Sequence, residues 1–299
     1  MFTISRDKVY DRLDKNIPPS AICESGETVI FETRDCYDDS VTSEERPLGD
    51  REDALGNPAT GPLYINGADA GDVLKVEILD ISLHSRGVMC ASFSWGIFAG
   101  RLPEAKAVMY EIEGDKIRFD DTLLLDCCPM IGVIGTAPAG EGIATSVPDV
   151  HGGNMDCRKI GAGTVLYLPV AVPGALLSMG DLHALMGDGE VFGCGLEIAG
   201  TVTVRVSVLK ENPIPTPFLI TRDAVITIQS AATVFEAGKT AARLMEEFVR
   251  RVTGLEEVKS EMLMSLVSHM SVCQIVNPLM TARVEFPRNI LEQYGWRAE

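Results

Sequence analysis

The stretch HGGNMD (residues 151–156), together with MGDLHALMGDGE (residues 179–190) and GCGLEIAG (residues 193–200), organises the rest of this 299-residue chain. It contains two of the four histidines and a group of carboxylates, namely His151, Asp156, Asp181, His183, Asp188, Glu190 and Glu197. Imidazole nitrogen and carboxylate oxygen are common ligands of Zn²⁺ and related divalent ions. The many glycines let the backbone turn tightly and approach a ligand closely. The stretch therefore predicts a divalent-metal site in one pocket.

The composition limits the partners of the chain. Hydrophobic residues make up 46% and charged residues 23%, which is typical of a globular protein. The net charge is −17 and no basic cluster occurs, so we expect neither nucleic acid nor an anionic membrane as a partner. No apolar run approaches the ~20 residues that span a bilayer. The charged N-terminus MFTISRDKVYDRLDKN lacks the apolar core of a secretory signal.

The eight cysteines are scattered and form no C-x-x-C motif, which favours reduced, mostly buried thiols in a cytoplasmic protein. Cys36, Cys157 and Cys194 lie near candidate site segments. A thiolate ligand at these positions stays open as an alternative to small-residue packing.

The order of the hydrophobic patterns predicts the fold of the first two thirds. Alternation around Val29 and Phe31 and over residues 73–81 is typical of strands. Residues 36–62 form a long polar stretch of the kind used for lids or partner-binding arms. Residues 84–110 have an irregular composition, and residues 108–125 predict two short strands around a Glu-Gly-Asp turn at 113–115. The Pro/Gly-rich residues 127–156 favour either a backbone-lined pocket wall or an irregular connection.

The C-terminal third changes to helical spacing. Apolar residues recur with this spacing from Thr233, which predicts a helix that ends at Gly254. A second helix is predicted from Glu256 to about Val272, and a strand over residues 281–287 closes the chain. The sequence thus predicts an α+β fold, mainly β with sandwich-like or barrel-like sheets and two helices in the C-terminal third. We expect a β-rich region at 1–150 and a region with the metal-site segment and C-terminal α/β elements at 151–299. The two can also pack as one intimate domain.

Pairs of histidine and carboxylate are the candidate metal ligands. Asp181 and His183 are two residues apart, so on an extended strand both side chains point to one face and can reach one ion. His151 and Asp156 offer a second pair on a glycine-rich turn. The competing interpretation of His151 is a turn histidine that hydrogen-bonds to the backbone. Asp35 directly follows a strand and could add a carboxylate.

Two glutamates flank a Gly-Cys-Gly turn and are the candidate catalytic residues. Glu190 or Glu197 can either ligate a metal or act as the general base that takes a proton from water. The remaining histidines lack this setting: His269 is expected to pack in a helical pattern, and His84 to lie on the surface in a turn.

Taken together, these motifs resemble the acetamidase/formamidase family. The resemblance rests on SGETVIFETRDC (residues 25–36), GNPATGPLYINGADAGDVLKVEI (56–78), PMIGVIGTAP (129–138), HGGNMD and GDLHALMGDGEVFGCGLEIAG, and it continues to residues 276–278. It implies hydrolysis of short aliphatic amides, such as formamide and acetamide, to a carboxylate and ammonia. It also implies a β-rich α+β fold, a bound divalent metal and a homo-oligomer, either a dimer or a tetramer.

The resemblance also implies which residues form the site. Zinc is preferred because of the histidines, with Ca²⁺ or Mg²⁺ as alternatives because carboxylates are abundant. The positions expected around the metal are Asp35, His151, Asp156, Asp181 and His183, and Glu190 and Glu197 also match family positions. Two departures bear on the substrate: Asp-Val precedes His151 where relatives have Asp-Cys, and Cys194 stands where relatives often have a small hydroxyl residue.

In the expected mechanism a carboxylate takes the proton from metal-bound water and delivers it to the leaving nitrogen. Glu197 is the first candidate for this role and Glu190 the second, and backbone N–H groups of residues 129–142 would stabilise the oxyanion. Two alternatives stay open. One is a metal-dependent hydrolase of another small C–N compound, such as a cyclic amide; the other is a non-catalytic small-molecule-binding protein whose metal is a structural clamp.

Overall fold

The structure is a computed structural model of residues 1–299, and it describes all of them except 48, 50, 92–95, 102 and 298–299. Strands with alternating buried residues build its first large sheet. In spatial order the nine strands are β1 (Phe2–Ile4), β5 (Thr28–Thr33), β18 (Gly200–Leu209), β7 (Val73–Leu83), β15 (Val165–Pro169), β19 (Phe218–Ile220), β20 (Ala224–Ala231), β22 (Met280–Pro287) and β21 (His269–Gln274). The first pair, β1 and β5, is parallel and the others are antiparallel.

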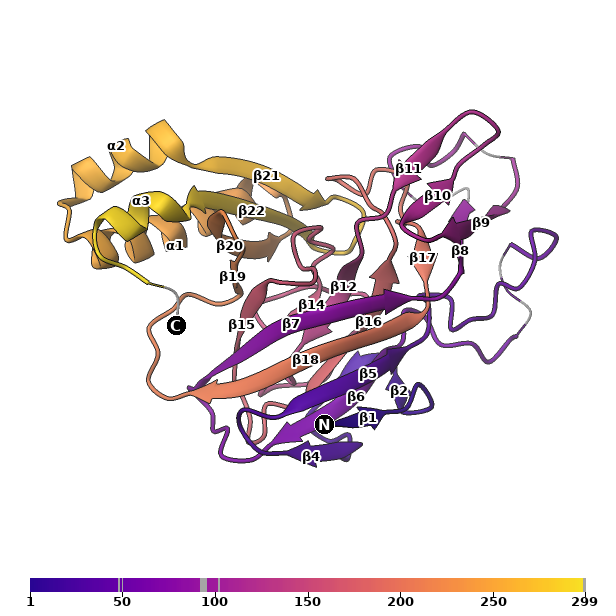
Figure 1. Cartoon of the computed structure of the whole chain (residues 1–299), viewed down its shortest axis with the longest axis horizontal. Helices are drawn as coiled ribbons and strands as arrows, with labels where there is room; N and C mark the ends of the chain where they lie inside the picture. Colours follow the sequence, from indigo (N-terminus) through magenta and orange to yellow (C-terminus); the bar gives the residue numbers. More distant parts are fainter. Residues whose placement is uncertain (48, 50, 92–95, 102, 298–299) are drawn as a thin grey trace.

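The second large sheet has eleven strands and carries the candidate site. Its main path is β11 (Leu124–Asp126), β10 (Lys116–Arg118), β9 (Lys106–Glu113), β8 (Arg86–Ala91), β17 (Glu197–Ile198), β16 (Leu177–His183), β12 (Met130–Gly135) and β14 (Gly152–Asn154). A branch leaves β16 through β6 (Ala59–Ile65), which also pairs with β2 (Val9–Tyr10) and β4 (Ala21–Cys23). A small separate sheet joins β3 (Arg12–Leu13) to β13 (Ile143–Ala144). Strands from both sides of residue 150 pair in both large sheets (Figure 1).

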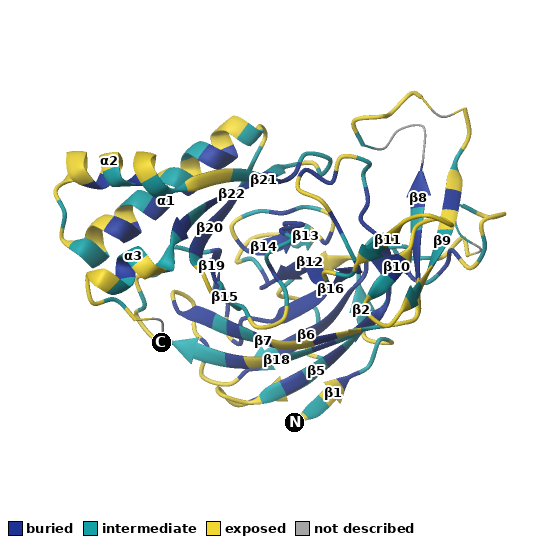
Figure 2. Ribbon diagram, turned by 45° about the horizontal axis from the view of Figure 1, so that its top comes forward, coloured by how far each residue is buried: buried dark blue, intermediate teal, exposed yellow. Residues whose placement is uncertain are grey.

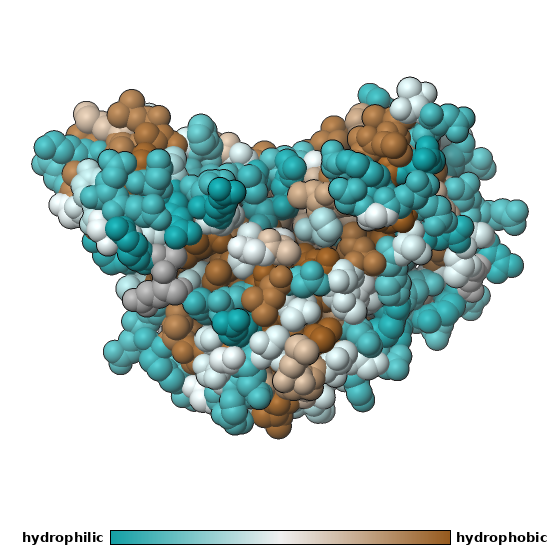
Figure 3. Space-filling model, viewed as in Figure 1, coloured by the Kyte–Doolittle hydropathy of each residue, from teal (hydrophilic) through white to brown (hydrophobic). Residues whose placement is uncertain are grey.

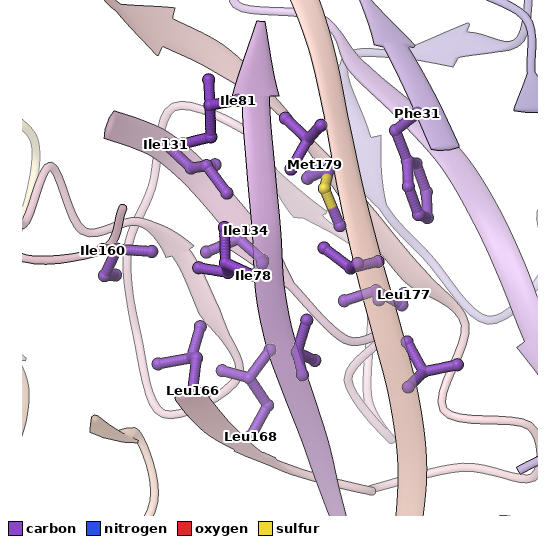
Figure 4. Packing of buried hydrophobic residues seen from close by; sticks show 14 of the residues in the cluster. Phe31, Ile78, Ile81, Ile131, Ile134, Ile160, Leu166, Leu168, Leu177 and Met179 are labelled. Carbon is purple, nitrogen blue, oxygen red and sulfur yellow. The ribbon is translucent and has the colours of Figure 1, made fainter. Parts of the chain in front are cut away.

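The main core lies between the two large sheets. Phe31 of β5 and Ile78 of β7 from the first sheet share one cluster of buried side chains with Ile131 of β12 and Leu177 and Met179 of β16 from the second (Figure 4). Each of these side chains is 0% or 1% exposed. Such burial supplies about 1.5–3 kcal/mol per large apolar side chain, so this layer holds the site-bearing strands in a rigid frame.

Three helices in the C-terminal third cover the far end of the first sheet: α1 (Val234–Thr253), α2 (Glu257–Val267) and α3 (Arg288–Gln293) (Figure 2). The Thr233 hydroxyl caps the start of α1 by accepting the Glu236 N–H at 3.2 Å, and Gly254 ends it with φ 70°. The buried face of α1, with Met245 and Phe248, packs in a second cluster with Phe286 of β22.

The predicted fold class is confirmed, and several local predictions need correction. The structure is mainly β with helices in the C-terminal third, and the described residues form no closed barrel. The second helix ends at Val267 instead of continuing to Val272, because the following residues pair with β22 as the edge strand β21. His269 therefore lies on a strand, with an exposed side chain, and the short helix α3 was not predicted.

Two segments that looked irregular contain regular strands. Residues 84–110 hold β8 and most of β9, which form an antiparallel pair, while residues 92–95 and 102 of this stretch lie outside the described residues. The Pro/Gly-rich residues 127–156 contain β12, in which all six residues are buried. Periodicity failed here because both faces of β12 are covered, so its side chains show no polar alternation.

Apolar side chains also reach the surface at two prominences. Figure 3 shows a broad notch between the helical end and the β9–β11 end of the molecule. At the helical end Met262 and Leu266 of α2 are exposed, and near β10 and β11 Phe119, Leu123 and Leu124 are exposed. No helix among the described residues combines the length and apolarity needed to cross a bilayer.

Candidate active site and metal centre

Three neighbouring strands of the second sheet bring the candidate residues together. Strand β16 carries Asp181 and His183, and His183 lies directly opposite Glu197 of β17. Strand β12 pairs with the other edge of β16. Strand β14 pairs with β12 in turn and ends two residues before Asp156. A turn with positive φ at Glu190 places the remaining glutamate in the same group. The antiparallel pairing of these strands therefore brings residues that are far apart in sequence close together in space.

The side chains of this group form two sets of ligand-type atoms. Asp156, His183 and Glu190 offer one set, whose three atoms lie within 4.8 Å of one another. The other set, with the same spacing, is Cys36, Asp181 and Glu197. His183 links the sets, because its Nε2 lies 3.0 Å from Glu197 Oε1 and 3.4 Å from Asp181 Oδ1.

Asparagine side chains hold the carboxylates of Asp156 and Asp181 in place. Asn277 Nδ2 donates to Asp156 Oδ2 at 2.6 Å, and Asn57 Nδ2 donates to Asp181 Oδ2 at 3.4 Å. With its amide turned so that nitrogen faces the carboxylates, Asn154 donates to Asp181 Oδ2 at 2.9 Å. These contacts fix the carboxylates in the way that hydrogen bonds from neighbouring groups orient metal ligands.

Burial and mutual repulsion shift the pKa values of the group. Burial raises the pKa of Asp156 and of Glu190, and the neighbouring carboxylates raise both further. Burial also raises the pKa of Glu197, although His183 opposes the rise. For His183, burial alone would lower the pKa, but the charges of Glu197 and Asp181 outweigh it and raise the pKa well above its usual range. The site therefore favours bound protons or a cation that replaces them.

Two glycines make room for the charged group. A Cβ on Gly132 would lie 2.5 Å from Asp181 Oδ2 and 2.6 Å from Asp156 Oδ1. A Cβ on Gly195 would lie 2.6 Å from Cγ and Nδ1 of His183. Both values are far below normal contact distances, so any larger residue at these positions would push the carboxylates or the imidazole away.

The group opens into a cavity of about 300 Å³, which includes Cys36, Tyr37, Asn57, Asp181, Glu190 and Glu197 in its lining. Among the described residues, Oε2 of Glu190 and Oε2 of Glu197 are buried without a hydrogen-bond partner. Buried carboxylate oxygens are normally paired or bound to a metal. The nitrogen and oxygen donors, the unpartnered oxygens and the space kept by Gly132 and Gly195 all fit a divalent cation.

Two of the predicted metal ligands lie outside both sets. His151 is 2% exposed, burial lowers its pKa to about 4, and neither of its ring nitrogens has a hydrogen-bond partner among the described residues, so the backbone does not satisfy this imidazole. Asp35 instead stabilises the turn after β5, because its Oδ1 accepts the N–H groups of Tyr37 at 2.9 Å and Asp39 at 2.8 Å. Asp188 also lies apart, in a bidentate ion pair with Arg283.

Sequence reasoning missed several residues of the site. Asn57, Asn154 and Asn277 approach the carboxylates from three separate segments, and asparagine alone gives no periodic signal. For Cys36 the sequence leaves open either a thiolate ligand or small-residue packing. Its neighbour Asp35 was the stronger candidate by residue type, but the backbone directs Cys36 toward the cluster.

Comparisons with known proteins show the family of the chain. The model of the acetamidase/formamidase family matches residues 2–141 and 130–236, and the chain belongs to this family. An acetamidase structure from Bacillus halodurans is 46% identical, with a TM-score of 0.95 over 98% of this chain and 100% of that one. The formamidase of Methylophilus methylotrophus is 26% identical over 302 residues, covering 78% of this chain and 74% of that protein.

The acetamidase of Mycolicibacterium smegmatis is 26% identical over 268 residues, which cover 67% of this chain. The matched regions span between 65% and 74% of the lengths of the curated relatives. The predicted resemblance to the family is therefore confirmed.

Proposed function

We propose that this chain is an amidase that hydrolyses short aliphatic amides, such as formamide and acetamide, to a carboxylate and ammonia. The observation that carries the proposal is the buried group of four carboxylates and one histidine beside a cavity of about 300 Å³. This volume is at the small end of ligand pockets, which suits a small substrate. Relatives named formamidase and acetamidase support the same activity.

We further propose that Asp156, Asp181 and His183 hold a divalent cation, with zinc preferred because of the imidazole. A bound ion of this kind supplies a Lewis acid that polarises the amide carbonyl and a means of lowering the pKa of water. The asparagines around the two aspartates then keep the carboxylate ligands in one orientation.

The proton carrier in this proposal is Glu190 ahead of Glu197, the reverse of the order that the sequence favours. Oε1 of Glu197 already accepts the Gly195 N–H at 3.0 Å and faces His183 Nε2, so this side chain is held in place. Glu190 sits on a turn, lines the cavity and has an unpartnered Oε2. Its raised pKa suits a group that takes a proton from the attacking water and gives it to the leaving nitrogen.

Ammonia release from formamide and acetamide tests the proposal. The purified protein should release ammonia from both amides, lose this activity on chelation and regain it with zinc. Glu190→Gln should lower kcat by about 10²–10⁴-fold with metal still bound, as expected for loss of a general base. Unchanged turnover in that variant would remove Glu190 from the role.

The same assay separates the alternatives. A panel of lactams in place of linear amides tests the hydrolase of a cyclic C–N compound. Metal binding without ammonia release from any of these compounds would support the non-catalytic binding protein instead.

We also propose a cytoplasmic homo-oligomer, a dimer or a tetramer, on the basis of the family resemblance. The exposed apolar residues of α2 and of the β10–β11 region are suitable contacts for a second copy. Light scattering at micromolar concentration that gives the mass of one chain would refute the oligomer.

A further inference from the structure

We propose that the chain prefers primary amides whose acyl group is a medium-length alkyl chain or carries a phenyl ring, and that an apolar pocket beside the proposed active site binds this group. The inference rests on the proposed amidase function and names its substrate class. The reaction is unchanged: the oxygen of water bonds to the acyl carbon, the C–N bond breaks, and the nitrogen leaves as ammonia with a proton from that water.

The apolar pocket is a second cavity, of about 250 Å³, lined by strands β8 to β11 and by residues from the segment 185–196. Each of the four strands contributes one apolar side chain, in chain order Met89, Tyr110, Ile117 and Leu125. The same four side chains belong to the main core cluster or pack against it. The pocket is therefore a recess at the edge of the hydrophobic core.

Charged groups are few in this apolar pocket. Among the described residues, Asp188 and Glu190 are the charged members of its lining. Both carboxylate oxygens of Asp188 accept hydrogen bonds from Arg283, which leaves Glu190 as the charged group at the edge of the pocket. Removal of apolar surface from water is thus the main interaction that the pocket offers, and it suits the hydrocarbon part of a ligand.

The apolar pocket adjoins the cavity of the proposed active site. Glu190 and Cys194 line both spaces, so the two spaces meet at these side chains. Glu190 is the proposed proton carrier, and the buried thiol of Cys194 behaves as a small apolar group. A substrate whose amide lies at Glu190 therefore has the apolar pocket within reach of its hydrocarbon part.

The acyl group is the part of the substrate that the pocket can take. The proposed reaction releases ammonia, so the amide nitrogen carries no apolar group and all the hydrocarbon is attached to the carbonyl carbon. An apolar cavity of about 150 Å³ is large enough for benzene. The pocket, at about 250 Å³, therefore has room for a phenyl ring or for an alkyl chain with a similar number of carbons.

The lining of the pocket reaches the surface, so a ligand can enter. Phe119 and Val191 belong to the lining and are 48% and 42% exposed. The ring of Phe119 stacks on that of Tyr110, with ring centroids 5.6 Å apart and an interplanar angle of 14°. This stacked pair forms a flat wall, against which the phenyl ring of a ligand can pack.

Steady-state ammonia release from straight-chain primary amides tests the inference. Each methylene group that enters the pocket should raise kcat/KM about fourfold, so the value for hexanamide should exceed that for acetamide by on the order of 10²-fold. Phenylacetamide should also exceed acetamide. A kcat/KM that stays constant or falls from acetamide to hexanamide would overturn the inference.

The isomer N-butylacetamide tests which side of the amide enters the pocket. It contains the same atoms as hexanamide but carries the butyl group on nitrogen, and its hydrolysis is followed by the release of acetate. We expect a kcat/KM far below that of hexanamide. A value equal to or above that of hexanamide would show that the pocket does not select the acyl group.

Substitutions on strand β11 test the pocket itself. Leu125→Trp fills the pocket, and it should abolish the preference for hexanamide over acetamide. Leu124→Trp is the matched control, because this neighbour on the same strand is 50% exposed and lies outside the lining, and it should keep the wild-type preference. If circular dichroism shows that Leu125→Trp is unfolded, Val191→Trp fills the pocket from the segment 185–196. A wild-type preference in the folded pocket variant would overturn the inference.

Calorimetric titration with hexanamide separates this inference from the proposed function. A protein that releases no ammonia from any amide, but binds hexanamide in a way that Leu125→Trp abolishes, would refute the amidase and support the pocket as the binding site for the acyl group. Ammonia release from acetamide without any preference for longer amides would do the reverse.

Discussion

Replacing Gly132 by alanine is the most direct perturbation of the carboxylate group. Gly132 lies in β12 beside Asp181, and its new Cβ would be 2.5 Å from Asp181 Oδ2 and 2.6 Å from Asp156 Oδ1. Real Cβ contacts are essentially never under 3.0 Å, so both oxygens must retreat by about half an ångström. Metal–ligand distances tolerate only about 0.2 Å. The retreat therefore exceeds what a fixed metal site absorbs.

We expect Gly132→Ala to weaken metal binding by about 10–100-fold, the range found when groups that orient ligands are changed, which corresponds to about 1.4–2.7 kcal/mol. Competition with a chromophoric chelator measures this affinity, and circular dichroism confirms the fold. Gly140→Ala is the control, because a Cβ there meets nothing within 4 Å, and its affinity should equal that of the wild type. Gly195→Ala provides a second variant, since its Cβ would crowd His183. Unchanged affinity in folded Gly132→Ala would refute the proposed ligands.

Three further predictions concern pH and stability. Burial raises the pKa of Glu197 from 4.5 to about 8. Between these pH values the folded, metal-free chain therefore holds a proton that the unfolded chain has lost. The free energy of unfolding of the metal-free protein should fall as pH rises from about 5 to 8. Melting temperatures of metal-free and zinc-loaded protein across this range check it, and a flat metal-free profile would disprove it. Arg283→Met removes a buried guanidinium from its ion pairs with the partly exposed side chains of Asp188 and Glu285 and should cost about 1–3 kcal/mol in urea unfolding. Arg86→Met removes an exposed pair and should cost at most about 1 kcal/mol. Thr233→Ala removes the cap of α1 and should cost about 1 kcal/mol in the same assay; no change would show that the cap is dispensable.

The sequence by itself determined the elements whose signals are local. Thr233 and Gly254 marked both ends of α1, and alternating residues marked β5 and β7, because capping and strand pleating depend on residues close in the chain. The two strands predicted around residues 113–115 are present as β9 and β10, whereas β8 and the end of α2 were not accessible in this way. Segment β21 becomes a strand because it pairs with β22 across the short connection of residues 275–279, and the spacing of its apolar residues does not indicate this pairing.

The same division applies to the site. The sequence selected Asp156, Asp181, His183, Glu190 and Glu197 because histidine and carboxylates cluster there, and the structure brings all five together. Only the tertiary structure decided which neighbours complete the group. It places Cys36 in the cluster while Asp35 turns to its own backbone, and it positions His151 outside both ligand sets. Residue type shows what a side chain can bind, but the direction of each side chain follows from strand register and turn geometry, which arise from pairing between segments far apart in the chain.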